Sequence, residues 1–150
     1  MEIIAGNRCT AEQRAVLAHA LVREFGNHYP DWTIDEAIDE LAAAGPVPTS
    51  LVAFEGDAVL GCASLLDDDE VTGWDGRHWL GNVVVLDTAR GRGIGAALVN
   101  AVEAHAVALG LTELHLVTST ALDWYVRRGW TTLGTADVHG HAMTVMRKAL

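Results

Sequence analysis

Apolar residues recur at helical spacing in two segments of the first third of the chain. The first segment follows Thr10–Gln13, and the second follows Thr33–Glu36. Both tetrapeptides are capping boxes, in which a threonine hydroxyl and a Glu or Gln side chain bond the free N–H groups at a helix start. The pattern therefore predicts two amphipathic helices, and Gly45-Pro46 is expected to end the second.

From about residue 50 onward, short apolar runs replace the helical spacing. The runs Leu51–Phe54 and Ala58–Leu66 flank a Glu-Gly-Asp turn and predict a β-hairpin. The further predicted elements are a strand at Trp79–Val85, a helix from Ile94 to Gly110, a strand at Glu113–Val117, a short helix from Thr120 to about Arg128, and strands at Trp130–Gly134 and His141–Met146. This order predicts an α/β fold in which a mixed, mostly antiparallel sheet of about six to seven strands carries helices on both faces.

Size and charge narrow the class of protein. A length of 150 residues predicts a single domain over residues 1–150. The net charge of −10 argues against a nucleic acid as partner and mildly favours a basic, amine-bearing substrate. No apolar run approaches the ~20 residues that cross a bilayer, and the first residues lack the features of an export signal. We therefore expect a cytoplasmic protein without a membrane partner, in which Cys9 and Cys62 are reduced thiols.

The segment Val83–Ala96 combines a predicted strand, a short approach and a glycine-rich entry into a helix. Glycines at positions 91, 93 and 95 allow a tight turn and let an anion approach the backbone N–H groups. Because the first N–H groups of a helix lack internal partners, the segment predicts a phosphate site. A nicotinamide-dinucleotide loop and a turn without a ligand are the alternatives. The dinucleotide interpretation is weakened because Val117 runs into Thr118, where an acidic residue would be expected.

Two motifs resemble the signatures of the GNAT superfamily of N-acetyltransferases. Arg90-Gly-Arg-Gly-Ile-Gly95 is similar to the first signature, Gln/Arg-x-x-Gly-x-Gly/Ala. Ala121-Leu-Asp-Trp-Tyr-Val-Arg-Arg-Gly-Trp130 resembles the second, Ala-x-x-Phe-Tyr-x-x-x-Gly-Phe, with Trp130 in place of the last phenylalanine. Thr118 stands where the family often has an asparagine. The clear likeness covers about Leu51 to Leu150, and the sheet expected from it is of the GNAT type.

The resemblance implies that acetyl-coenzyme A (acetyl-CoA) is the co-substrate and that its acetyl group moves to a primary amine. It also implies that the strand before the glycine loop parts from the next strand and admits the pantetheine arm. The backbone of Val83 and Val85 would bond the pantetheine amides, the N–H groups of residues 91–96 would hold the pyrophosphate, and two arginines would add positive charge. The residues expected to bind the cofactor are Val83, Val84, Val85, Arg90, Gly91, Arg92, Gly93, Ile94, Gly95, Ala96 and Thr118.

Tyr125 is the catalytic residue that the resemblance implies. Acetyl transfer leaves a thiolate on coenzyme A, and a nearby hydroxyl can protonate it as a general acid. The alternative is a packing role for this aromatic side chain. The general base stays open, because Trp79 occupies the position at which some family members carry a glutamate. His78, Asp69 and Glu70 are weak candidates in a segment expected to be solvated.

The acceptor is expected to be a small-molecule or peptide amine. Tyr29 and Trp32 lie where family members shape the acceptor pocket, although they could equally pack two helices together. His139 and His141 have a spacing that could bind a metal, but no third ligand is evident and no metal site is expected. The family also includes dimers that pair a C-terminal strand, so a homodimer is compatible with the sequence. The alternative function is a non-catalytic acyl-CoA-binding or sensor domain of the same fold.

Overall fold

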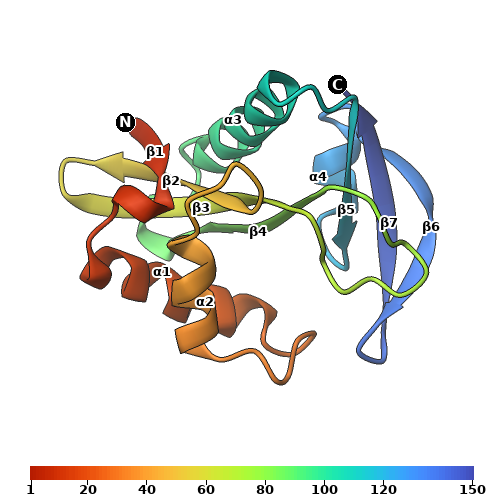
Figure 1. Ribbon diagram of the computed structural model, residues 1–150, viewed down its shortest axis with the longest axis horizontal. Helices are drawn as coiled ribbons and strands as arrows, with labels where there is room; N and C mark the ends of the chain where they lie inside the picture. The colour runs from red at the N-terminus through yellow and green to blue at the C-terminus, as the bar shows by residue number, and fades with distance from the viewer.

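A continuous seven-stranded sheet organises the computed structural model, which describes residues 1–150 (Figure 1). Its strands are β1 (Glu2–Ala5), β2 (Thr49–Glu55), β3 (Ala58–Leu66), β4 (Trp79–Val85), β5 (Glu113–Thr118), β6 (Thr131–Val138) and β7 (His141–Ala149). They lie in the order β1-β2-β3-β4-β5-β7-β6. Five of the six neighbouring pairs are antiparallel, and only β4 and β5 run parallel.

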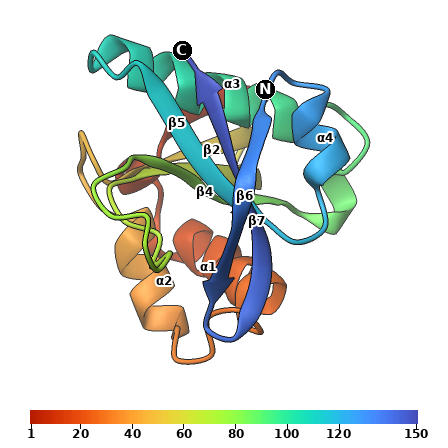
Figure 2. The ribbon, with the colours of Figure 1, turned by 90° about the vertical axis from the view of Figure 1, so that its right-hand side faces the viewer.

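Four helices cover the sheet: α1 (Ala11–Phe25), α2 (Ile34–Leu41), α3 (Ile94–Ala108) and α4 (Leu122–Val126). Helices α1 and α2 lie on one face and α3 lies on the other (Figures 1 and 2). Both predicted capping boxes are formed, because the Thr10 and Thr33 hydroxyls accept hydrogen bonds from the N–H groups of Gln13 and Glu36 at 3.1 Å. These local bonds set where the two helices begin.

Strands β4 and β5 meet at one end only. Trp79, the first residue of β4, is in register with His115, and no further residue pair joins the two strands. Beyond this pair β4 stays with β3, while β5 stays with β7 (Figure 1). The fork between them leaves backbone groups without a strand partner. The parting of these two strands agrees with what the GNAT resemblance implied.

Buried apolar clusters hold the layers together. One cluster packs α3, through residues such as Leu98, against the sheet, and a second packs α1 and α2, through Leu17 and Leu41, against the opposite face. A third joins Val71 of the β3–β4 loop to Val145 of β7. Removing such side chains from water is the main favourable term in folding, and it fixes the elements that border the fork.

The predicted fold class is confirmed, with differences in detail, among them a β7 that extends past Met146 to Ala149. Strand β1 was not predicted, because its four residues carry no alternating pattern, and the open edge of β2 is what pairs with them. Strand β6 continues past Gly134 to Val138, since a register shift between Thr132 and Gly134 absorbs the glycine. Helix α4 is shorter than predicted. None of the helices combines the length and the apolar character needed to cross a membrane.

Candidate active site

A groove of about 550 Å³ opens at the fork between β4 and β5. It is bordered by the end of β4, the glycine-rich loop, the start of α3, and α4. Its lining includes Val83, Val84, Val85, Arg90, Gly91, Gly93, Ile94, Gly95 and Ala96. We call this space the cofactor groove. Nine of the eleven residues that the sequence predicted for the cofactor therefore line one groove.

The glycine-rich loop ends in a helix start that no side chain caps. Gly91 and Gly93 have φ angles of +79° and +75°, a conformation that a residue with a Cβ rarely adopts. Gly93 is the N-cap of α3, and the first turn of this helix contains no acidic residue. A Cβ on Gly95 would lie 3.6 Å from Val85 Cγ2 and 3.8 Å from Trp124 Cζ2. The start of α3 thus has free N–H groups at the positive end of its dipole, facing a groove that glycine keeps wide.

The backbone of β4 also faces the groove at alternate residues. The N–H group of Leu86 donates to the Leu60 carbonyl at 2.8 Å, so the backbone N–H and C=O groups of Leu86, and of Val84 two residues before it, point toward β3. The backbone groups of Val83 and Val85 point the other way, toward the fork, because the hydrogen-bonding groups of successive residues in a strand point to opposite sides. The Arg90 Nε donates to the Val85 carbonyl at 3.2 Å, in agreement with this orientation. These two residues are the ones for which the family resemblance implies bonds to the pantetheine amides.

A bulge precedes these two residues in β4. Asn82 has a φ of +54°, and the pairing of β3 with β4 shifts register between Cys62 and Ser64. The Asn82 carbonyl accepts a hydrogen bond from the Cys62 thiol at 3.4 Å. Asparagine tolerates this left-handed conformation better than most residues. The bulge changes the direction of β4 where the fork opens. Nothing in the sequence pattern indicated the bulge.

The arginines predicted to meet the cofactor have different surroundings. Arg90 lines the cofactor groove and pairs with Asp87 at 3.2 Å. Arg92 does not line the groove, because its guanidinium is hydrogen-bonded to Glu55. Arg128, outside the predicted set, lines the groove with its guanidinium 3.6 Å from the centre of the Trp124 ring. The positive charge at the groove therefore comes from the positions 90 and 128.

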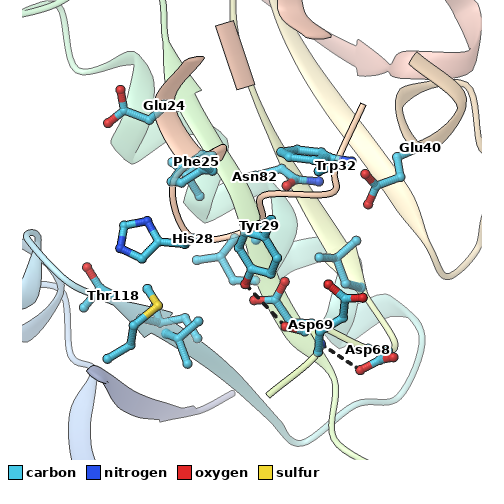
Figure 3. Close-up of a pocket in the computed structure, with 18 of the residues that line it drawn as sticks. Glu24, Phe25, His28, Tyr29, Trp32, Glu40, Asp68, Asp69, Asn82 and Thr118 are labelled. Carbon is cyan, nitrogen blue, oxygen red and sulfur yellow. Dashed lines mark hydrogen bonds between the residues drawn. The ribbon is translucent and has the colours of Figure 1, made fainter. Parts of the chain in front are cut away.

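A second and larger cavity, of about 830 Å³, adjoins this groove and is lined by residues of both β4 and β5; Figure 3 shows residues that line it. Its walls are the end of α1, the α1–α2 loop, α2, the β3–β4 loop and β5. Tyr29 and Trp32 line it, with ring centres 6.3 Å apart in an edge-to-face arrangement. The Tyr29 hydroxyl donates to the Asp69 backbone carbonyl at 3.3 Å. We call this space the acceptor cavity; the aromatic pair both packs the loop and borders the cavity.

Tyr125 lines both spaces. Its side chain is 8% exposed, and its hydroxyl has no hydrogen-bond partner within the protein. Burial raises the pKa of Tyr125 to about 12, although Arg128 opposes the shift. The ring packs edge-to-face on Trp124 and Trp130, with centres 4.9 Å and 6.0 Å away. A protonated phenol with a free hydroxyl thus stands at the junction of the two spaces.

The β3–β4 loop is not uniformly solvated, and the expectation for Asp69 was wrong. Its carboxyl is partly buried in the acceptor cavity, and an ideal Cβ on Gly81 would lie 3.8 Å from its Oδ1. Burial, reinforced by the charges of Glu40 and Asp68, raises the pKa of Asp69 to about 8. Burial likewise raises the pKa of Glu40. Glu70 is exposed and lies 3.4 Å from His139 Nε2.

The remaining predicted residues fall outside the cofactor groove. Thr118 lines the acceptor cavity, and its Oγ1 accepts a hydrogen bond from the Ala121 N–H at 3.0 Å, so it shapes the turn before α4. His141 packs against His28, with ring centres 4.5 Å apart, while His139 faces Glu70. The two histidines thus have different neighbours, and no group of three or more potential ligands is arranged to hold a metal ion.

Sequence reasoning missed most of the acceptor cavity. Its acidic side chains come from α1, the α1–α2 loop, α2 and the β3–β4 loop, and Figure 3 labels examples from α1, α2 and the β3–β4 loop. The predicted apolar face of α2 was a usable signal, because its polar face, including Glu36 and Glu40, had to point elsewhere. Nothing in the sequence showed that this face borders the same cavity as Asp69.

Comparison with known proteins identifies the family. Residues 15–130 match the model of the acetyltransferase (GNAT) family. An aminoglycoside 6'-N-acetyltransferase solved with coenzyme A is 18% identical, with a TM-score of 0.78 over 99% of this chain and 97% of that chain. The aminoglycoside 6'-N-acetyltransferase from Enterococcus faecium is 19% identical, with a TM-score of 0.74 over the same shares. The PaiA N-acetyltransferase from Thermoplasma acidophilum, also solved with coenzyme A, is 14% identical, with a TM-score of 0.72 over all of both chains. Since the family model spans most of its length, this chain belongs to the GNAT acetyltransferase family.

Proposed function

We propose that this protein is an N-acetyltransferase that moves the acetyl group of acetyl-CoA to a primary amine by direct attack. The observation that carries the proposal is the position of Tyr125, whose free hydroxyl lies where the cofactor groove meets the acceptor cavity. Membership of the GNAT family supports acetyl transfer. The coenzyme A found in solved relatives of the same fold supports the identity of the co-substrate.

The cofactor groove fits coenzyme A in its charge and in its shape. The pyrophosphate would accept hydrogen bonds from the N–H groups of residues 91–96, where the dipole of α3 favours an anion. Arg90 and Arg128 would add positive charge. The backbone groups of Val83 and Val85 would bond the pantetheine amides in place of a missing strand. Arg90 Nε would give up its bond to the Val85 carbonyl.

In the reaction, the nitrogen of a neutral amine forms a bond to the thioester carbonyl carbon, and the carbon–sulfur bond then breaks. The departing thiolate takes a proton from the Tyr125 hydroxyl. The newly bonded nitrogen then loses its surplus proton to the Tyr125 phenolate, directly or through water, which leaves a neutral amide, free coenzyme A and a protonated Tyr125. A raised pKa keeps this phenol protonated at neutral pH, so that it is available as a donor. Both cysteines are buried, and neither lines the two spaces, which supports transfer without an acyl-enzyme.

Asp69 is our candidate for the general base that deprotonates the acceptor ammonium. It lines the acceptor cavity beside Gly81, next to the bulge of β4. A carboxylate with a pKa near 8 is a stronger base than an ordinary aspartate, which suits proton removal from an ammonium group near neutral pH. The proton can pass directly or through one water molecule, and return to solvent through the open side of the cavity.

The test is turnover measured by two readouts on the same sample. Release of the coenzyme A thiol and gain of one acetyl group by the amine, seen by mass spectrometry, must rise together. Thiol release without an acetylated amine would indicate hydrolysis of acetyl-CoA only. Binding of coenzyme A without transfer to any amine would instead support the alternative, a non-catalytic acyl-CoA sensor, and would contradict the proposed function.

A further inference from the structure

The acceptor cavity carries a concentration of acidic side chains. Eight of the protein's 20 Asp and Glu side chains line it: Glu24, Asp31, Glu36, Asp39, Glu40, Asp68, Asp69 and Glu70. None of the ten Lys and Arg side chains does. The labelled acidic groups of Figure 3 come from α1, α2 and the β3–β4 loop, so they surround the space rather than follow one exposed segment.

These carboxylates have no cationic partner of their own. The four ion pairs that Lys and Arg side chains form involve Asp87, Glu55, Glu113 and Glu103, none of which lines the cavity. Within the cavity only Glu70 meets a basic group, the His139 imidazole at 3.4 Å. The partly buried members also feel one another, since burial and, after it, neighbouring carboxylates raise the pKa of Asp69 and of Glu40. The fold therefore tolerates a local excess of like charge that a cationic ligand would relieve.

The cavity is also connected to the reacting centre. Four residues line both the cavity and the cofactor groove: Glu24, Val83, Ala121 and Tyr125. The Tyr125 side chain is buried and its hydroxyl is unpartnered, so the shared boundary is the place where transfer would occur. A ligand that reaches this boundary with one amine would leave the rest of its length among the carboxylates of α2 and the β3–β4 loop.

The size and the lining of the acceptor cavity favour a ligand larger than a short monoamine. A volume of about 830 Å³ is in the range of sites for drug-sized molecules, which is far more than a short monoamine fills. Phe25, Tyr29 and Trp32 add aromatic surface to the same walls. Aromatic faces attract ammonium groups as well as hydrocarbon.

We propose that the acceptor is a small polycation, which carries at least one ammonium group in addition to the amine that is acetylated. The proposal rests on the proposed function, since it names the substrate class of the same site. A linear polyamine and an aminosugar with several amino groups share this chemistry. One amine, deprotonated, would meet the thioester beside Tyr125, and the remaining ammonium groups would pair with Glu40 and the acidic β3–β4 loop.

The experiment compares kcat/KM for matched amines at a fixed, saturating acetyl-CoA concentration. Putrescine and butylamine have the same carbon chain and differ by one amino group; spermidine and kanamycin represent the linear and the aminosugar polycations. We expect kcat/KM to be at least about tenfold higher for putrescine than for butylamine, since one added ion pair in a partly buried site produces effects of this order. Turnover of spermidine but not kanamycin assigns a linear polyamine, and the reverse assigns an aminosugar.

Two variants test whether the preference for putrescine over butylamine arises from the acceptor cavity. Glu40→Gln should lower kcat/KM for putrescine several-fold more than for butylamine, since it removes one carboxylate from the wall. Asp57→Asn removes the same charge from the exposed β2–β3 turn and should change neither. Equal kcat/KM values for putrescine and butylamine, or equal effects of the two variants, would overturn the inference while leaving the acetyltransferase in place. Acetylation of none of these amines by a protein that binds coenzyme A would instead count against the proposed function itself.

Discussion

Trp79 of β4 and His115 of β5 form the single in-register pair between the two parts of the sheet, and their ring centres lie 5.6 Å apart. Both side chains are buried, and burial lowers the pKa of His115, which keeps the imidazole neutral. From this pair the strands diverge, so one contact determines where the cofactor groove begins.

Amide hydrogen exchange should report occupation of the fork. Saturating coenzyme A is expected to slow exchange at Val83 and Val85 by about tenfold or more, because their N–H groups would gain partners that β5 does not supply. Val84 points toward β3 and serves as an internal control whose exchange should change much less. Equal slowing at all three positions would indicate general stabilisation and would argue against the backbone contacts proposed here.

Replacing Tyr125 by phenylalanine tests the general acid. We expect kcat to fall by about 10²-fold or more, within the range typical of general acid catalysis, with little change in the KM for acetyl-CoA. The chain's other tyrosine provides the control: Tyr29→Phe loses a hydrogen bond to the Asp69 carbonyl and should act mainly on the KM for the amine. Full activity of Tyr125→Phe would transfer the acid role to water.

Two substitutions in the glycine-rich loop separate cofactor binding from folding. Gly93→Asp places a carboxylate at the helix start and at a φ of +75°, and should abolish binding of coenzyme A in a protein that still folds. Gly95→Ala adds an uncharged methyl group on the groove wall, at ordinary contact distance from Val85 and Trp124, so it should weaken binding much less than Gly93→Asp and gain up to about 1 kcal/mol of stability. Calorimetric titration and thermal unfolding would measure both effects. Undiminished affinity in Gly93→Asp would remove the loop from the cofactor site.

The raised pKa of Asp69 predicts that the difference in stability between the native protein and an Asp69→Asn variant depends on pH. Between about pH 4 and pH 8 the folded protein holds this proton more tightly than the unfolded chain, so the carboxyl makes folding less favourable as pH rises. Asp69→Asn cannot ionise. The free energy of unfolding of the variant relative to the native protein should therefore increase across this range, by on the order of 1 kcal/mol or more, and level off above it.

The same variant tests the base. Asp69→Asn should lower kcat/KM by about 10²-fold and remove the dependence on the Asp69 titration, while the titration of the amine substrate itself persists. Denaturant unfolding and pH–rate profiles of the two proteins provide the comparison. A stability difference without a change in the pH–rate profile would leave Asp69 as a buried carboxyl with no part in proton transfer.

Sequence alone predicted most of the cofactor groove but little of the acceptor cavity. The groove is built from two short sequence motifs, one around Gly93 at the start of α3 and one around Tyr125 in α4, and each motif can be recognised from the spacing of its own residues. Arg92 shows the limit of this reasoning, because its partner Glu55 lies on another strand. The cavity depends on the packing of α2 and the β3–β4 loop around β4, and the environment of Asp69 follows from that packing. No local pattern encodes such long-range proximity.

Thermal unfolding with and without ligand would show whether the folded protein binds coenzyme A. Acetyl-CoA, coenzyme A, NAD and ATP would each be added well above a plausible Kd. A ligand at one hundred times its Kd stabilises the folded state by about 2.7 kcal/mol, which corresponds to a rise in Tm of roughly 5 °C or more for a chain of this size. We predict such a rise with acetyl-CoA and coenzyme A and a clearly smaller one with NAD and ATP. No rise with either coenzyme A species would mean that the groove between β4 and β5 does not bind coenzyme A, and the proposed acetyl transfer would fall with it.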